Sequence, residues 1–441
     1  MAYEIDVDDA EEVVERVAAI DVAKASGMVC TRVPHPTTAN RRVTKVWNVA
    51  STTNAIMALA DELAALDIER VVVESTSDYW RPFVYLLEAR GLHVWLVNAQ
   101  EVKQVPGRPK TDKLDAVWLA KLNERGMLRP SFIPPQEIRN LRDYTRLRVD
   151  LVEERHRHKQ RVEKLLEDAL IKLSGVASDI FGASGRAMLD ALIAGERDPV
   201  ALAELAKGRM RVKHDALVQA LTGRFDKHHA ELLSMLLDQI DSLDAKVDAI
   251  TARVSELLAE IPAARAPAAP PGASGDTIPL DVIARLDEIT GIGMVAAQAI
   301  VAEVGLDMTQ FPTADHLVSW AKLSPRTIQS GTKSRSARPG KGNPYLKRFL
   351  GEAAVSAAKT DTFVGERYRR LAKRRGKLKA VVAIARSILV IVWHLLSDPT
   401  ARYRDLGVDY YPTQVNTARR TRNLVHQLEA LGHQVIITPA A

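Results

Sequence analysis

The stretch Pro109-Lys110-Thr111-Asp112-Lys113-Leu114-Asp115-Ala116 places two aspartates three positions apart, where a helix is expected to begin. At that spacing both carboxylates project from one face of the first turn. Two like charges held together are costly unless a cation lies between them, and a hard divalent metal is the usual cation. Alternatively, Asp112 caps the helix and Asp115 complements its dipole. The fragment alone leaves both interpretations open.

The residues upstream of this helix predict a mixed sheet with helices on its faces. Runs of strand formers alternate with stretches of helical periodicity. The predicted elements are strands at 13–20, 27–33 and 42–49, a helix at 51–66, a strand at 70–74, a helix at 80–90, a strand at 93–97 and the final helix from Asp112. The order β-β-β-α-β-α-β-α is typical of an α/β domain.

Two further acids lie at strand ends in this order. Asp21 comes just after the first apolar run, and Glu74 ends a later one. The two strands are expected to be neighbours, so the carboxylates can meet at one edge of the sheet. A single Asp at a strand end is usually a turn residue. Together with Asp112 and Asp115, however, they predict a site that holds one or two Mg²⁺ ions against a phosphate.

Three motifs carry a family resemblance: Ile20-Asp21-Val22-Ala23-Lys24, Val73-Glu74-Ser75-Thr76 and Lys110-Thr111-Asp112-Lys113-Leu114-Asp115-Ala116. They resemble the acidic tetrad of RuvC-like folds of the RNase H type. More narrowly, they resemble the DEDD transposases of insertion sequences, also called bridge recombinases. The third motif is the most specific. The resemblance implies that Asp21, Glu74, Asp112 and Asp115 are catalytic and bind Mg²⁺.

Composition is that of an ordinary globular protein: 441 residues, 46% hydrophobic and 26% charged. The length suggests about two to three domains. A single cysteine, Cys30, excludes an internal disulfide and fits a cytoplasmic location. The N-terminus lacks the build of a signal peptide. The longest apolar run, 380–396, is interrupted by Arg386 and His394, so we predict a buried helix and no membrane partner.

Positive charge is concentrated in one part of the chain. The net charge is +6, but the segment from Arg326 to Lys379 holds sixteen Lys and Arg against three acidic residues, a net +13. The rest of the chain therefore sums to about −7. Because local acidic partners are missing, this basic block predicts a polyanionic partner, most simply nucleic acid.

The middle of the chain is predicted to be helical. Residues 136–175 are highly charged, and their cations could follow a phosphate backbone or simply cover a solvated helix: Arg139, Arg142, Arg146, Arg148, Arg155, Arg157, Lys159 and Arg161. Further on, apolar residues recur in steps of three and four: Leu233, Leu236, Ile240, Leu243, Val247, Ile250, Val254, Leu257 and Ile261. This heptad seam predicts a coiled coil between subunits of a dimer or tetramer. The alternative is an antiparallel hairpin with the 139–172 helix.

Alanine, proline and glycine dominate residues 262–279, which we interpret as a linker. The predicted divisions are a RuvC-like catalytic domain at 13–130, a helical and coiled-coil region at 136–261, this linker, a C-terminal transposase domain at 280–412 and a tail at 413–441. The expected fold is thus an α/β RuvC-like domain, a helical coiled-coil middle and a mostly α C-terminal domain.

The C-terminal domain contains a candidate nucleophile. Ser330 precedes Gly331 on what we interpret as a flexible loop among several cations. A serine hydroxyl is a poor nucleophile unless its developing charge is stabilised and its proton has an acceptor. By itself Ser330 is more often a loop serine. The stretch from Leu323 to Arg348 resembles the C-terminal domain of the same transposases, in which a serine before glycine is the nucleophile. The resemblance assigns that role to Ser330 and none to Ser324.

Glycines and cations of this half are the predicted nucleic-acid contacts. Thr290-Gly291-Ile292-Gly293 resembles the hairpin of helix-hairpin-helix modules, where backbone N–H groups approach a phosphate; the alternative is a tight helix–helix turn. The candidates are Gly291, Gly293, Arg326, Lys333, Arg335, Arg338, Lys341, Lys347 and Arg348.

These observations predict a transposase that recombines DNA at specific sites. The expected partners are donor and target DNA, and the resemblance further implies a structured guide RNA. One alternative is a junction-resolving nuclease in which the acidic residues activate water. Another is a nucleic-acid-binding scaffold without catalytic activity.

Overall fold

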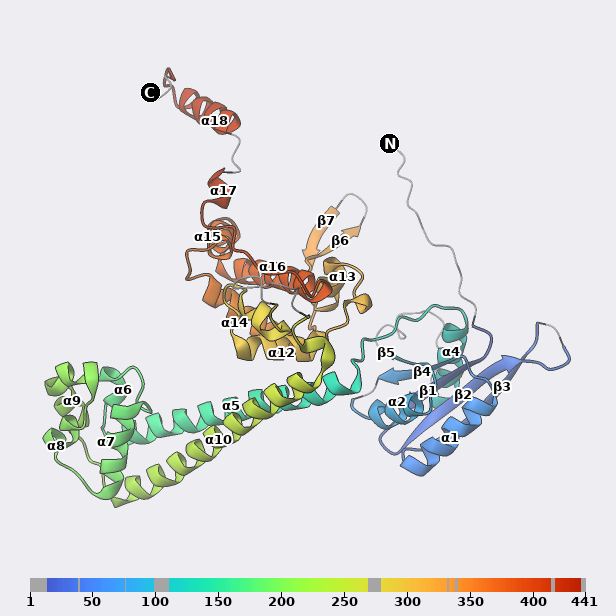
Figure 1. The fold of residues 1–441 in the computed structure, drawn as a ribbon, viewed down its shortest axis with the longest axis horizontal. Helices are drawn as coiled ribbons and strands as arrows, with labels where there is room; N and C mark the ends of the chain where they lie inside the picture. Colours follow the sequence, from blue (N-terminus) through green and yellow to red (C-terminus); the bar gives the residue numbers. More distant parts are fainter. Residues whose placement is uncertain are drawn as a thin grey trace. The chain divides into compact units, whose positions relative to one another are not determined.

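The computed structural model describes residues 14–38, 40–75, 77–98, 111–268, 279–330, 333–337, 340–413 and 417–437. Side chains are described at these positions except 75, 112, 326–330, 333–337, 412, 413 and 417–420. The chain divides into two compact units, Met1–Ile133 and Pro134–Ala441 (Figure 1).

The first unit contains a mixed five-stranded sheet of order β3-β2-β1-β4-β5. Its strands are β1 (Val17–Val22), β2 (Ser26–Pro34), β3 (Arg42–Ala50), β4 (Arg70–Ser75) and β5 (Val94–Asn98). β1, β2 and β3 form an antiparallel meander, whereas β1, β4 and β5 are mutually parallel. The predicted element order and the adjacency of the first and fourth strands are confirmed. Most predicted bounds shift by one or two residues, and β1 differs most, because it begins at Val17 and continues through Asp21 to Val22.

Helices cover both faces of this sheet, as Figure 1 shows. They are α1 (Thr53–Ala65), α2 (Trp80–Ala89) and α4 (Asp112–Glu124). Successive strand residues point to opposite faces. Ile20 and Val73 therefore pack with α1 and α2, and Ala19 and Val72 pack with α4. This is the mixed α/β architecture that the sequence predicts.

The second unit is mostly helical. Its longer helices are α5 (Gln136–Asp168), α7 (Ala183–Ala194), α9 (His214–Leu221), α10 (Lys227–Glu260), α12 (Met294–Val304), α14 (Pro344–Ala357), α15 (Phe363–Arg375), α16 (Lys377–Ser397) and α18 (Thr417–Ala430). The shorter ones are α6 (Leu173–Val176), α8 (Pro199–Glu204), α11 (Val282–Asp287), α13 (Ala314–Trp320), α17 (Tyr410–Thr413), η1 (Gly208–Lys213), η2 (Pro262–Ala264) and η4 (Met308–Gln310). A two-stranded hairpin joins β6 (Arg326–Ser330) and β7 (Lys333–Ala337).

α5 and α10 form an antiparallel hairpin within the chain. His229 near the start of α10 lies 3.2 Å from Asp168 at the end of α5, and Arg155 pairs with Asp244 further along. Seam residues Leu233 and Val254 are buried inside this unit. The intramolecular hairpin, which the sequence left as the alternative, therefore accounts for much of the heptad seam. A subunit contact along it stays a prediction.

The C-terminal helices pack on this hairpin through a buried carboxylate. Glu303 of α12 is 1% exposed and accepts two hydrogen bonds of 2.8 Å from Arg146 of α5. Arg142, one turn earlier, donates to the backbone oxygens of Ala302 and Glu303. The cations of α5 are thus largely engaged inside the unit, which favours their structural interpretation over a phosphate-tracking one.

α16 is the predicted buried helix. In the described part of the chain it is the one helix long and apolar enough to cross a membrane by length and composition. Its apolar residues, including Ile384, Ile388 and Val392, are buried within the second unit. Arg285, itself 5% exposed, donates to the carbonyl oxygens of Leu395 and Asp398 at its C-terminal end. Residues 435–437 form an apolar run typical of a strand, but they carry no strand pairing.

Candidate active site

Asp21 and Glu74 are direct neighbours across β1 and β4. The parallel register pairs Asp21 with Glu74, one step beyond the pair Ile20 and Val73. Both acids share the strand face of Ala19 and Val72, which is the face that α4 covers. Asp21 is half-buried, and Glu74 is 4% exposed. The sequence prediction that these two carboxylates meet at one sheet edge is consistent with this register.

The direction of α4 brings its first turn to the same edge. Near its C-terminus, Asn123 donates to the carbonyl oxygens of Ala18 and Arg70 at 3.1 and 3.2 Å, at the beginnings of β1 and β4. From Asn123 back to Asp115 the helix rises about 12 Å. From Ala18 to Asp21 the strand advances about 10 Å. Asp115 therefore lies at about the level of Asp21 and Glu74.

A buried anchor that sequence reasoning missed fixes this alignment. The Arg70 side chain is 3% exposed and donates from Nε to Asn123 Oδ1 at 2.7 Å and from Nη2 to the Asn123 backbone oxygen at 2.8 Å. Its guanidinium also lies over the Trp95 ring at 4.0 Å. An arginine that opens an apolar strand is the only sequence signal for this anchor.

The N-cap of α4 is Thr111, whose Oγ1 accepts from the Leu114 backbone N–H at 3.3 Å. Asp112 is the first helical residue, so the alternative that Asp112 itself caps the helix is wrong. The Asp112 side chain lies outside the described residues. Its metal-binding role stays a prediction.

Three of the four predicted acidic residues have described side chains: Asp21, Glu74 and Asp115. Carboxylate oxygens are the donors that Mg²⁺ prefers, so the chemistry of this set fits the predicted metal. Among the described residues, no three acidic, histidine or cysteine side chains come close enough to count as a metal-binding group. The set is therefore a candidate that depends on Asp112 or on the substrate for completion.

Cys30 lies behind this edge in the core between the sheet and α4. Burial raises the pKa of its thiol to about 11, against the opposing effect of Arg32. The thiol therefore stays protonated at neutral pH and serves as a packing group rather than as a metal ligand or nucleophile.

The candidate nucleophile lies in the second unit. Ser330 is the last residue of β6, and its backbone pairs with Lys333 of β7. The loop expected from the sequence is therefore a strand end. The side chains of Ser330, Arg326, Lys333 and Arg335 lie outside the described residues, as does all of Arg338.

The chain segment that follows the β6–β7 hairpin, residues 340–347, is held by specific contacts. Lys347 Nζ donates to the Gly340 backbone oxygen at 2.6 Å, and its pKa is lowered by burial and by nearby Lys322. Gly342 has φ +57°, and a Cβ there would meet the Ala321 oxygen at 2.5 Å. Asn343 caps α14 and donates to Glu303 Oε2 at 2.5 Å. Lys347 is thus a structural contact that fixes the backbone just after the hairpin.

The other candidate nucleic-acid contacts differ in their packing, exposure and ion pairs. A Cβ on Gly291, which has φ +92°, would meet the Ala353 oxygen at 2.3 Å, so this glycine is required for packing. Gly293 is exposed at the N-cap of α12. Arg348 pairs with Glu153 and Glu352. Lys341 is exposed and has no recorded partner in the described part of the chain.

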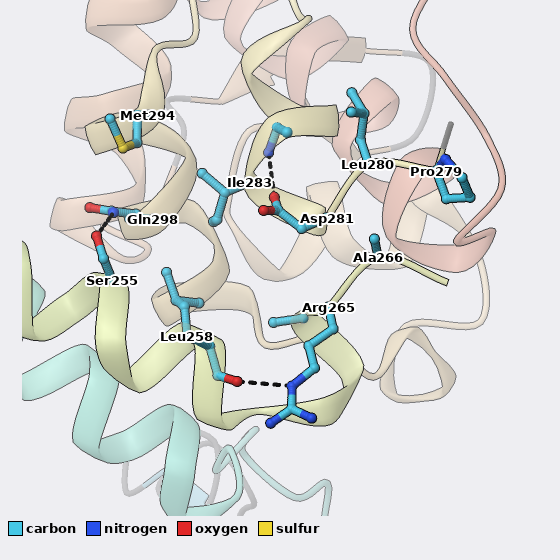
Figure 2. Close-up of a pocket in the computed structure, with 13 residues that line it drawn as sticks. Ser255, Leu258, Arg265, Ala266, Pro279, Leu280, Asp281, Ile283, Met294 and Gln298 are labelled. Carbon is cyan, nitrogen blue, oxygen red and sulfur yellow. Dashed lines mark hydrogen bonds between the residues drawn. The ribbon is translucent and has the colours of Figure 1, made fainter. Parts of the chain in front are cut away.

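A surface cavity of about 610 Å³ lies between the end of α10 and helices α11 and α12 (Figure 2). Its one carboxylate, Asp281, is engaged as the N-cap of α11. Its amide, Gln298, is hydrogen-bonded to Ser255 and Arg148. None of the predicted catalytic residues lines it, so the cavity is not the candidate active site.

Comparison with protein-family models identifies the class of protein, which is that of insertion-sequence transposases. A transposase model of the DEDD type from IS110 elements matches residues 18–171. A second model, of the IS116/IS110/IS902 transposase family, matches residues 283–369. The chain therefore carries both IS110 transposase domains in their expected order, and the prediction of a transposase is confirmed at this level.

Individual relatives match more narrowly. The insertion element IS110 uncharacterized 43.6 kDa protein of Streptomyces coelicolor is 33% identical over 117 residues, which are 26% of this chain and 29% of that protein. The chain thus spans under a third of that relative. Two solved structures of Thermus thermophilus RuvC, one in complex with a Holliday junction substrate, are 14% and 15% identical, cover 26% of this chain and 99% of theirs, and give TM-scores of 0.21 and 0.20. Similarity of that size supports no functional conclusion.

Proposed function

We propose that this protein cleaves and rejoins DNA as the recombinase of an insertion sequence. The observation that carries the proposal is the direct cross-strand pairing of Asp21 with Glu74 on the face covered by α4, in a chain that carries both IS110 transposase domains. Two neighbouring carboxylates, one of them buried, are costly without a cation, which favours a metal-dependent phosphate site.

Ser330 is the proposed nucleophile. Its Oγ forms a bond to a DNA phosphorus while the bond from that phosphorus to the 3′ oxygen breaks, and the serine proton ends on the released 3′ hydroxyl. Attack by a 3′ hydroxyl on the phosphoserine reverses the step and joins a new strand. Mg²⁺ bound by Asp21, Glu74, Asp112 and Asp115 would stabilise the charge that develops on the phosphate.

The partners belong to the same proposal. Donor and target DNA are the substrates, and a structured guide RNA selects them. A homo-oligomer, dimer or tetramer, assembles through the part of the α10 seam that is half-buried, such as Val247 and Ile250. Sequencing the RNA that co-purifies with the full-length protein tests the guide directly.

The nucleophile is tested by a pair of serine variants. We expect Ser330→Ala to abolish strand exchange and the covalent protein–DNA adduct seen on a denaturing gel, in reactions with Mg²⁺, co-purified RNA and donor and target plasmids. Ser324→Ala, six positions away and without a proposed role, is the matched control. Cleavage that survives Ser330→Ala without an adduct would instead favour the water-activating nuclease.

The acidic edge is tested in the same reactions. We expect Asp21→Asn and Glu74→Gln to lose cleavage by at least about a hundredfold, because each removes a charged metal ligand. Asp67→Asn is the control, since Asp67 is exposed and has φ +48°, a conformation that asparagine tolerates. Normal Mg²⁺-dependent activity in both acidic variants would remove this edge from the mechanism, and a wild type that neither cuts nor joins DNA would favour the scaffold.

A further inference from the structure

Five exposed cations lie at the sharp corner between α15 and α16. Lys373, Arg374 and Arg375 form the last turn of α15, Gly376 with φ +85° separates the helices, and Lys377 and Lys379 begin α16. All residues from 373 to 379 are exposed. These five cations are called the basic corner below.

The cations of the basic corner have no acidic partner among the residues that the structure describes. Within the described part of the chain, none of its five side chains has a recorded hydrogen bond or ion pair. Cations earlier on α15 behave differently: Arg369 pairs with Asp361 and Glu366, and Arg367 donates to the Tyr411 hydroxyl at 2.9 Å. The local acids are thus engaged before the corner is reached.

Helix dipoles account for only part of the basic corner. Cations in the last turn of α15 are favoured by the negative end of its dipole. Lys377 and Lys379 lie in the first turn of α16, where cations are disfavoured and where no acidic residue compensates. These two lysines weaken the helix they begin, so the stability of the fold does not explain them.

An apolar side chain lies between Lys377 and Lys379. Leu378 is 86% exposed, although Ala380, two residues later, is fully buried. An exposed leucine flanked by lysines matches the pattern of proteins that contact a DNA groove, in which cations bind phosphates and an apolar residue presses on the bases.

We propose that the basic corner is a docking site for the backbone of duplex DNA, with Leu378 contacting the groove. The site rests on the proposed function, because it would hold one of the recombinase's DNA substrates. It lies at the end of the basic block 326–379 but apart from the serine hairpin and the Gly291–Gly293 turn, so it assigns a contact to residues that the sequence did not single out.

The test is the salt dependence of binding by the full-length protein to a labelled 30-base-pair DNA duplex without Mg²⁺, so that no chemistry is needed. Each phosphate contact contributes about 0.9 to the slope of log affinity against log salt. We expect Lys377→Gln with Lys379→Gln to reduce that slope by about 1.8. The thermal midpoint should stay the same or rise, because both lysines oppose the α16 dipole.

Lys207→Gln with Lys246→Gln is the matched control. It removes the same charge at exposed sites on other parts of the second unit and should leave the slope unchanged. We expect Leu378→Ala to weaken binding about equally at every salt concentration, because leucine releases no counterions. An affinity unchanged by Leu378→Ala would overturn the groove contact.

Other outcomes separate the possible failures. If the wild type binds duplex DNA and the double lysine variant binds with the same slope, the basic corner is refuted while the proposed function stands. If only duplex RNA of the same sequence responds to the variant, the corner binds RNA and the DNA assignment is wrong. If the wild type, carrying its co-purified RNA, binds no DNA at any salt, the proposed function itself fails.

Discussion

Replacing Glu303 with alanine removes a carboxylate on which three helices converge. Arg146 donates to both of its oxygens at 2.8 Å, Arg142 Nε lies 3.3 Å from Oε2, and Asn343 Nδ2 donates to Oε2 at 2.5 Å. Removing one partner of a buried ion pair costs about 3–5 kcal/mol. The carboxylate is 1% exposed, but the Arg142 and Arg146 side chains are 17% and 31% exposed and can reach water. We therefore expect a loss near the lower limit, about 3 kcal/mol.

A second substitution separates charge from volume. Glu303→Gln keeps the size of the side chain and one acceptor oxygen but loses the charge. We expect it to cost about 2 kcal/mol, the value of a hydrogen bond to a charged group. Glu352→Ala is the control, because Glu352 is 61% exposed in its pair with Arg348 and such pairs contribute about 0–1 kcal/mol.

Urea unfolding followed by far-UV circular dichroism measures these losses, because most helices belong to the second unit. Labelling of Cys30 in the same samples reports the first unit, where the single cysteine is buried, and should be unaffected. A loss below about 1 kcal/mol for Glu303→Ala, which is typical of an ordinary substitution, would refute the reasoning. So would an equal loss for Glu352→Ala.

Two further predictions concern backbone and thiol. Gly291→Ala should destabilise the second unit by about 1–3 kcal/mol in thermal unfolding, because φ is +92° and the new Cβ would meet the Ala353 oxygen at 2.3 Å. Gly351→Ala is the comparison: a Cβ there would meet nothing within 4 Å, so we expect it to stabilise the unit by about 0.5–1 kcal/mol. Burial raises the pKa of Cys30 to about 11, above its value of about 8.5 in the unfolded chain. Stability should therefore fall as pH rises between these values, by up to about 1.4 kcal/mol per pH unit, and Cys30→Ala should remove that part of the slope in urea unfolding at a series of pH values. Equal slopes in both proteins, or equal effects of the two glycine substitutions, would contradict these expectations.

The sheet could be predicted from the sequence because its signals are local. Alternating and apolar runs give the strands, and their order places the first and fourth side by side. The carboxyl ends of parallel neighbours meet at one edge, so Asp21 beside Glu74 follows from topology alone. The Arg70–Asn123 anchor did not follow, because its partners are 53 residues apart and neither residue type is specific to such a contact.

The heptad seam shows a different limit. Periodicity establishes that Leu233 and Val254 face another helix, but it does not identify that helix. In the structure the partner is α5, some 90 residues earlier in the chain, as the Arg155–Asp244 pair shows. Likewise, Ser330 was expected in a loop because its glycine and cations are typical of loops, whereas cross-strand pairing with Lys333 makes it a strand end.

The charge of the second unit cannot be assessed by counting residues alone. A cation paired with a carboxylate, as Arg146 is with Glu303, is largely cancelled beyond a Debye length of about 8 Å. The arginines of α5 therefore contribute more to packing within the unit than to the electrostatic field outside it. Among the described residues, Lys341 and the basic corner are examples of exposed cations without an acidic partner. A phosphate backbone that approaches such positions gains electrostatic energy without breaking an internal ion pair first.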